Sequence, residues 1–121
     1  MIDAERLTRA GIDYAAGLER FMNDPELYEA VLTAFAGENI LDRARVAYEK
    51  KDYAQLLNVV HEAKGSGGNA GLDNVYAEAS ALVKLLRSPS YTDEEVKEDY
   101  ERFARTYTAS QDGIKAALGL I

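Results

Sequence analysis

The residues of this sequence that could do chemistry lie close together in the middle of the chain. His61 is the only histidine, and Lys64 follows it by three residues. A neutral imidazole is a nucleophile. On a helix, a lysine three positions further on lies one turn away, so its ammonium group can stay close to a group attached to the ring. The pair therefore combines a nucleophile with a cation close to anything that is attached to the ring.

Four of the nine glycines of the chain come directly after this pair, and they are Gly65, Gly67, Gly68 and Gly71. The surrounding residues predict a helix, yet each glycine inside a helix costs about 1 kcal/mol relative to alanine. Several residues of low helix propensity inside a predicted helix indicate a functional site.

Helical geometry predicts which of these residues face outward. Successive residues advance about 100° around an α-helix, so the apolar positions of segment 53–67 share a face about 80° wide, and His61 lies roughly 130° from its centre. We therefore expect an exposed imidazole. A second face, also about 80° wide, is expected to form a partner-binding strip in which the glycines leave room for a partner. The members of this strip are Leu57, His61, Gly65, Gly68 and Leu72.

Four long amphipathic segments each follow a residue that can cap a helix, and the expected caps are Asp24, Asp52, Asp73 and Thr92. Pro25 occupies the first position of the first segment, which we expect to run to about residue 51 with Gly37 as its weak point. In the second segment Gly67 is expected to face the core and Gly71 to end the helix. In the third, Tyr76 and Val83 accompany the apolar stripe.

The predicted fold is all-α. Four amphipathic helices with short connections predict an antiparallel up-and-down four-helix bundle over residues 24–121. Two shorter helices, capped by Asp3 and Asp13, are expected to form an N-terminal arm over residues 1–22. Met22 and Tyr28 have the spacing of a hydrophobic staple between arm and bundle. Residues 1–121 therefore form one domain.

Composition excludes several classes of function. The net charge of -7 argues against nucleic-acid binding, which needs a basic patch. There is no cysteine for a disulfide or thiolate metal site, and no apolar run of the roughly 20 residues that would cross a membrane. We expect a cytoplasmic monomer without a metal or membrane partner.

The histidine motif resembles that of the histidine-containing phosphotransfer (HPt) domain family, which has the form H-x-x-K-G-x-x-x-x-x-G followed by an apolar residue. The matching residues are His61, Lys64, Gly65, Gly71 and Leu72. Segments 11–13, 17–18 and 24–28 look like the N-terminal lead-in of the family, and Phe35 recurs at the expected place.

This resemblance implies a relay in two-component signalling. Such domains accept a phosphoryl group on the histidine from a receiver-domain phosphoaspartate or a sensor histidine kinase, and pass it to the aspartate of a response-regulator receiver. His61 would be the phosphoacceptor and Lys64 would stabilise the phosphoryl charge. The domain would be a phosphocarrier rather than an enzyme, with no cofactor of its own and with Mg²⁺ supplied by the partner receiver.

The sequence departs from the family in one respect and leaves one alternative function open. Many members place Gln or Glu 22 residues after the histidine to hydrogen bond the ring, and here that residue is Val83, with Ser80 and Lys84 as neighbours. The alternative is a helical module that docks a receiver or kinase without relaying phosphate. A nucleotide loop is disfavoured because Lys64 precedes the glycines, and a di-metal bundle because Asn58 stands where Glu is needed.

Overall fold

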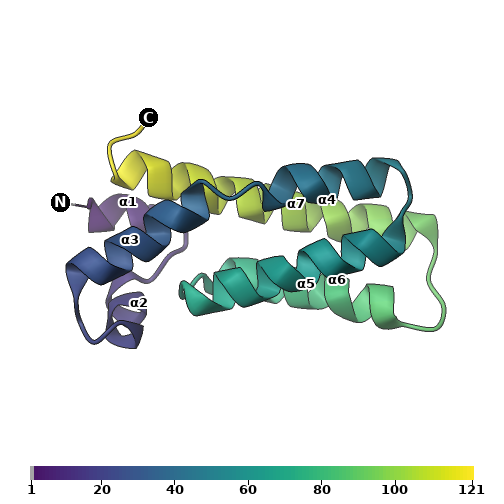
Figure 1. The fold of residues 1–121 in the computed structure, drawn as a ribbon, viewed down its shortest axis with the longest axis horizontal. Helices are drawn as coiled ribbons and strands as arrows, with labels where there is room; N and C mark the ends of the chain where they lie inside the picture. The colour runs from purple at the N-terminus through teal and green to yellow at the C-terminus, as the bar shows by residue number, and fades with distance from the viewer. Residues whose placement is uncertain (1) are drawn as a thin grey trace.

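The computed structural model describes residues 2–121, and Met1, the first residue of the expected arm, lies outside them. The described chain folds into seven α-helices and contains no strand, so the all-α prediction is confirmed (Figure 1). Their bounds are α1 (Ala4–Arg9), α2 (Tyr14–Arg20), α3 (Pro25–Ala36), α4 (Ile40–Glu49), α5 (Tyr53–Asn69), α6 (Asp73–Arg87) and α7 (Asp93–Ala117). Over residues 2–121, none of these helices has the length and apolarity that crossing a membrane requires.

Most helix starts are fixed by the predicted caps. The carboxylates of Asp3, Asp13, Asp24 and Asp52 accept hydrogen bonds from backbone amides of the first turn of their helices. Thr92 and Glu95 form the expected capping box of α7. The prediction for Asp73 is wrong by one residue, because Leu72 is the N-cap of α6 and makes no side-chain cap hydrogen bond. Asp73 lies instead in the first turn, where its charge complements the helix dipole.

The expected helix from residue 25 to about residue 51 is broken into α3 and α4, so that prediction is wrong. Gly37 ends α3, and α4 begins at Ile40. Two backbone carbonyls at the break accept hydrogen bonds from Gln111 Nε2 of α7, that of Phe35 at 3.1 Å and that of Glu38 at 3.2 Å. The break forms where helix propensity is low and a side chain from another helix satisfies these carbonyls.

Helix α5 lies against α4 and α6, and α6 lies against α7, while α1 and α3 contact the other half of α7 (Figure 1). One continuous hydrophobic core joins all of these helices, and Tyr28, Phe35, Phe103 and Tyr107 are among its largest fully or almost fully buried side chains. The two ends of the described chain meet at one end of the molecule, where the Asp3 amide donates to the Ala117 carbonyl at 2.9 Å.

The N-terminal helices reach the end of α5 through an aromatic contact. The Phe21 ring stacks on Tyr28 with 5.3 Å between ring centroids, and the Tyr28 hydroxyl donates to the Ala70 carbonyl at 2.9 Å. Met22 does not form the expected staple, because its side chain is 85% exposed and its backbone has a positive φ of 56°. The left-handed turn at Met22 directs the chain so that Phe21, rather than Met22, packs on Tyr28.

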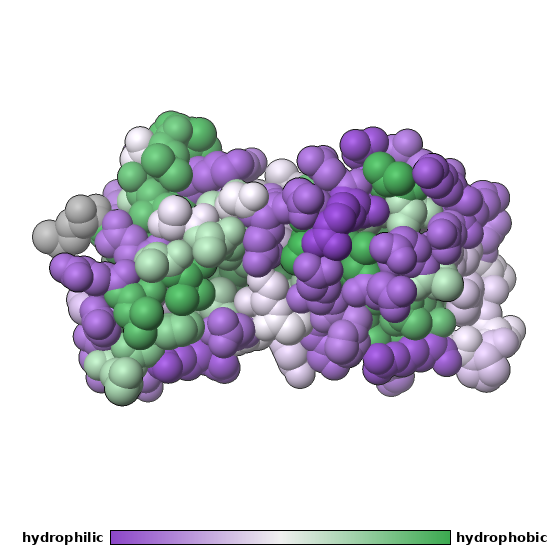
Figure 2. All heavy atoms as spheres, in the orientation of Figure 1, coloured by the Kyte–Doolittle hydropathy of each residue, from purple (hydrophilic) through white to green (hydrophobic). Residues whose placement is uncertain are grey.

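Apolar and charged surfaces are separated on the face shown in Figure 2. Apolar side chains gather over α3 and near the C-terminal end of the chain, whereas the half formed by α4, α5 and α6 is mostly hydrophilic. The most exposed large apolar side chains are Met22, Leu120 and Ile121. Ile121 therefore does not extend the apolar stripe of α7, which ends at Ala117.

A buried tyrosine makes the stability of this core sensitive to alkali. Tyr107 is fully buried, and its hydroxyl donates to Glu38 Oε2 at 3.0 Å. Burial, reinforced by the negative charge of Glu38, raises the pKa of Tyr107 far above its ordinary value of 10.0. The folded protein therefore keeps this proton at a pH where an unfolded tyrosine loses it.

We predict that the free energy of unfolding falls above about pH 10, because the unfolded state then binds fewer protons than the folded state. A tyrosine that keeps its proton only in the folded state lowers the free energy of unfolding by up to about 1.4 kcal/mol per pH unit. Tyr107→Phe should be less stable at neutral pH, since it loses the hydrogen bond to Glu38, but should show a shallower alkaline slope. Urea unfolding between about pH 9 and pH 11 measures both slopes, and equal slopes would contradict the assignment.

Candidate functional site

Helix α5 presents His61 to solvent. On its opposite side it buries Leu56, Val60 and Ala63 in the core. His61 is exposed, so the predicted outward orientation of the imidazole is confirmed.

The end of α5 removes one member from the predicted strip. Gly71 has a φ of +74°, and the Leu72 amide donates to the Gly67 carbonyl at 2.8 Å, so the predicted helix stop is confirmed. Leu72 lies beyond this turn, is only 1% exposed and belongs to the core. Its assignment to the partner-binding strip is wrong, because helical geometry no longer applies once the chain has left the helix.

The three glycines inside α5 have different surroundings. A Cβ on Gly65 would meet no other atom within 4 Å, whereas a Cβ on Gly67 would lie 2.7 Å from Val75 Cγ1. Gly65 is therefore open, and Gly67 faces α6 as expected. A Cβ on Gly68 would lie 3.0 Å from Tyr76 Cδ2, so this glycine is half-buried under a ring of the same chain. The expectation that Gly68 leaves room for a partner is therefore wrong, because Tyr76 already occupies that space.

The strip is thus narrower than predicted. His61 and Gly65 are its exposed members, while Leu57 is partly buried against the core. An open length of backbone beside one imidazole remains on the outer face of α5.

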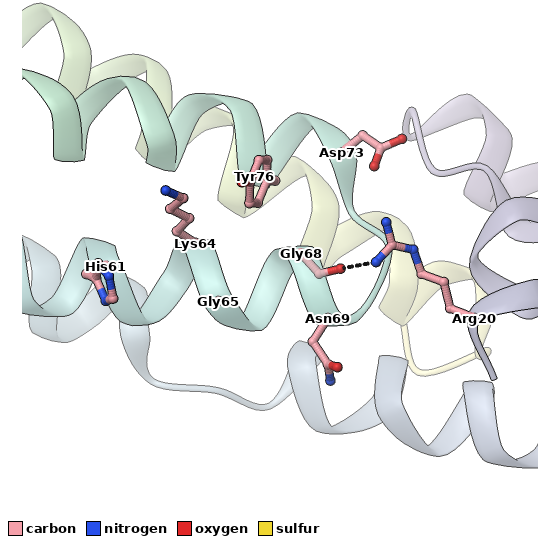
Figure 3. A pocket seen from close by; sticks show the side chains of 8 residues that line it. All are labelled: Arg20, His61, Lys64, Gly65, Gly68, Asn69, Asp73 and Tyr76. Atoms are coloured by element: carbon pink, nitrogen blue, oxygen red, sulfur yellow. Dashed lines mark hydrogen bonds between the residues drawn. The ribbon is translucent and has the colours of Figure 1, made fainter.

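His61 opens onto a hollow of about 620 Å³ between α5, the start of α6 and the arm (Figure 3). Its lining residues are Arg20, His61, Lys64, Gly65, Gly68, Asn69, Asp73 and Tyr76. The hollow therefore brings the predicted pair His61 and Lys64 together with charged residues from two other helices.

Lys64 extends from α5 toward α6, where its Nζ lies 5.6 Å from the centre of the Tyr76 ring (Figure 3). A cation over an aromatic face at an exposed site gains about 0.5–1 kcal/mol. Tyr76 was expected in the apolar stripe of its helix, but it is 45% exposed, and its ring covers Gly68 and faces Lys64.

Arg20 is a site residue that the sequence did not indicate. Its Nη1 donates to the Gly68 carbonyl at 3.0 Å, across 48 residues of sequence, and the guanidinium lines the hollow (Figure 3). Arg20 and Lys64 place two cations in the hollow that holds the imidazole. No motif in the sequence links Arg20 to α5, because the contact depends on how the arm folds back.

The residue 22 positions after the histidine contributes no polar group. Val83 is 3% exposed and packs in the core between α6 and its neighbours. Its neighbour Ser80 has a buried hydroxyl, and within residues 2–121 this hydroxyl has no hydrogen-bond partner. Neither Ser80 nor Lys84 therefore takes the place of the expected Gln or Glu in the structure.

An ion pair next to His61 ties α5 to α4. The Arg43 guanidinium donates to both carboxylate oxygens of Glu62, at 2.8 and 3.0 Å. This hydrogen bonding lowers the pKa of the Glu62 carboxyl and raises that of Arg43. Both side chains are more than one third exposed, so solvent screening limits the contribution to stability to about 0.2–1 kcal/mol. The pair neutralises the negative charge of Glu62, the residue next to His61.

Residues 2–121 contain no group of three or more His, Cys, Asp or Glu side chains that could hold a metal ion. The hollow offers one nucleophile, the two cations Arg20 and Lys64, one carboxylate at the start of α6, Asp73, and an open approach over Gly65. That arrangement can bring an anionic group to the imidazole and hold it there.

No protein-family model, curated protein or solved structure matches this chain.

The surroundings of the glycines predict opposite effects of one added methyl group. Gly65→Ala should stabilise the fold by up to about 1 kcal/mol, because alanine favours the helix and its Cβ meets nothing. Gly67→Ala should destabilise it by about 1–3 kcal/mol, because the methyl group would push α5 and α6 apart. Urea unfolding of the two variants checks the difference in sign, and a shift in the same direction for both would contradict the packing.

Proposed function

We propose that this protein is a phosphocarrier of the histidine-containing phosphotransfer kind. It accepts a phosphoryl group on His61 from a receiver-domain phosphoaspartate or a sensor histidine kinase, and passes it to the aspartate of a response-regulator receiver. The observation that carries the proposal is the exposed imidazole beside the open backbone of Gly65, with Lys64 lining the same hollow. A partner's reacting group can reach the ring there with no side chain in between.

In the proposed transfer, Nε2 of the neutral imidazole attacks the phosphorus of an aspartyl phosphate. The N–P bond forms while the P–O bond to the aspartate breaks, and the aspartate leaves as a carboxylate. The proton on Nδ1 is then released to water. Transfer to the next receiver reverses these bond changes. The reaction depends mainly on positioning and on neutralising charge.

Lys64 supplies part of that neutralisation. A charge-assisted hydrogen bond to a phosphoryl oxygen is stronger than a cation–π contact at an exposed site, which gains about 0.5–1 kcal/mol. Lys64 can therefore leave the Tyr76 ring when a phosphoryl group arrives on His61. Arg20 lies further along the same hollow and is suited to an acidic group of the docked partner.

The partner is proposed to supply the rest of the machinery. Mg²⁺ comes with the receiver, and this chain acts as a substrate of its partners rather than as an enzyme. We propose a cytoplasmic monomer in which α3 and α4 together serve as the first helix of an antiparallel up-and-down four-helix bundle. Helices α5, α6 and α7 are its other members, and α1 and α2 are its arm.

Phosphate acceptance by His61 is tested by mixing the protein with a phosphorylated receiver. We predict acid-labile, alkali-stable phosphate on the wild type and none on His61→Gln, whose circular dichroism should be unchanged because the ring is exposed. Label on His61→Gln would place the acceptor elsewhere. Receiver binding without label on the wild type, with every receiver encoded in the same genome, would favour the alternative of a docking module that does not relay phosphate.

The open backbone at Gly65 predicts a graded effect of side-chain size on transfer. Gly65→Gln should slow phosphotransfer by about tenfold or more, because the side chain occupies the approach to the imidazole. Gly65→Ala is the matched control and should transfer at nearly the wild-type rate. Rapid-quench kinetics with a phosphorylated receiver measure both rates. Gly68 is a poorer position for this test, because a side chain there would displace the Tyr76 ring.

A further inference from the structure

A second hollow, of about 440 Å³, lies on α5 and the C-terminal half of α6 and shares only Lys64 with the hollow at His61. Its lining residues are Lys64, Ser80, Val83, Lys84, Arg87 and Ser88. Every charged residue of this hollow is therefore a cation.

This concentration of positive charge is unusual for the chain. The sequence has 21 acidic and 14 basic residues, yet no carboxylate lines the hollow. Within residues 2–121, the ion pairs of the structure include none of Lys64, Lys84 and Arg87. Three cations around one hollow repel one another unless an anion lies between them. The electrostatics of the hollow therefore favour a negatively charged ligand.

The helix dipole explains only part of this arrangement. Lys84 and Arg87 lie in the last turn of α6, where positive charge is favourable on any helix. That effect accounts neither for Lys64, which comes from α5, nor for Ser80. The Ser80 hydroxyl is buried without a hydrogen-bond partner in the described chain, and a buried hydroxyl in that state destabilises the fold. Both features are explained if a ligand with several acceptor oxygens binds in the hollow and the Ser80 side chain, which lines it, rotates to donate its hydroxyl to that ligand.

We propose that this second hollow is a binding site for a phosphate-class oxyanion, held by Lys64, Lys84 and Arg87 with Ser80 as a hydroxyl donor. The donors come from two helices and bring three positive charges to one hollow, which suits a tetrahedral dianion. A planar carboxylate carries one charge and is satisfied by a single arginine fork. The ligand is inorganic phosphate or the phosphate group of a small molecule.

The position of Lys64 gives this site a consequence for His61, which rests on the function proposed above. Lys64 lines both hollows, so an oxyanion in the second hollow and a phosphoryl group on His61 compete for one ammonium group. Each therefore weakens the binding of the other, and thermodynamic linkage makes the effect reciprocal. A high concentration of free phosphate would then disfavour the phosphorylated form of the protein.

Binding is tested with the unphosphorylated full chain and inorganic phosphate, at constant ionic strength, by amide chemical shifts in ¹H–¹⁵N NMR spectra. We expect saturable shifts at Lys64 and over residues 80–88, the same pattern with sulfate, and at least tenfold weaker binding of acetate. Shifts that never saturate, or equal binding of acetate, would overturn the proposal. This titration requires no receiver and no phosphotransfer, so its outcome is independent of whether His61 is a phosphoacceptor.

Two double variants that remove the same charge test which residues bind phosphate. Lys84→Ala with Arg87→Ala should weaken phosphate binding at least tenfold, and both side chains are exposed, so the fold should persist. Arg105→Ala with Lys115→Ala on α7 removes the same charge, includes a last-turn lysine and should leave binding unchanged. Equal weakening in both double variants would show that net charge alone is responsible and would refute a site.

Ser80→Ala separates the hydroxyl from the charges. It should weaken phosphate binding several-fold while stabilising the ligand-free protein, because it removes a buried hydroxyl without a partner. Unchanged affinity would exclude Ser80 from the site.

Discussion

The site depends on how closely α5 approaches α6, and that approach requires a residue without a side chain at position 67. A Cβ on Gly67 would lie only 2.7 Å from Val75 Cγ1. At this separation the next residue of α6, Tyr76, covers Gly68 and brings its ring within 5.6 Å of Lys64 Nζ. The same approach places Lys64 between two hollows, one containing His61 and the other lined by the cations of α6.

The glycine-rich half of α5 has low helix propensity, and contacts from distant parts of the chain hold it in place. The Tyr28 hydroxyl and the Arg20 guanidinium donate to the carbonyls of Ala70 and Gly68. On the other side, the Ser66 hydroxyl donates to the Glu38 carboxylate, at 2.8 Å to Oε1. Because hydrogen bonds from the arm and from the break between α3 and α4 support this segment, it can remain helical while leaving one face open.

The features that the sequence predicted correctly depend on interactions within a few residues. Capping by Asp24 and Asp52 and the stop at Gly71 are set by side chains and backbone angles next to them. The exposure of His61 and the inward position of Gly67 follow from helical periodicity and from the apolar face that the core must bury. For these residues, the local chain and the tertiary structure require the same conformation.

The features that the sequence did not predict arise where residues far apart in the chain meet. Gln111 satisfies the carbonyls at the helix break, Arg20 crosses 48 residues to reach α5, and Tyr76 covers a glycine that helical geometry alone placed in the open. Leu72 is buried because the chain turns at Gly71 and enters the core. The sequence by itself determined the all-α class, most helix starts and the outward histidine, since these depend on local backbone preferences and periodicity. Only the tertiary structure decided which residues of other helices line the hollow beside the histidine, because no local pattern encodes how those helices pack.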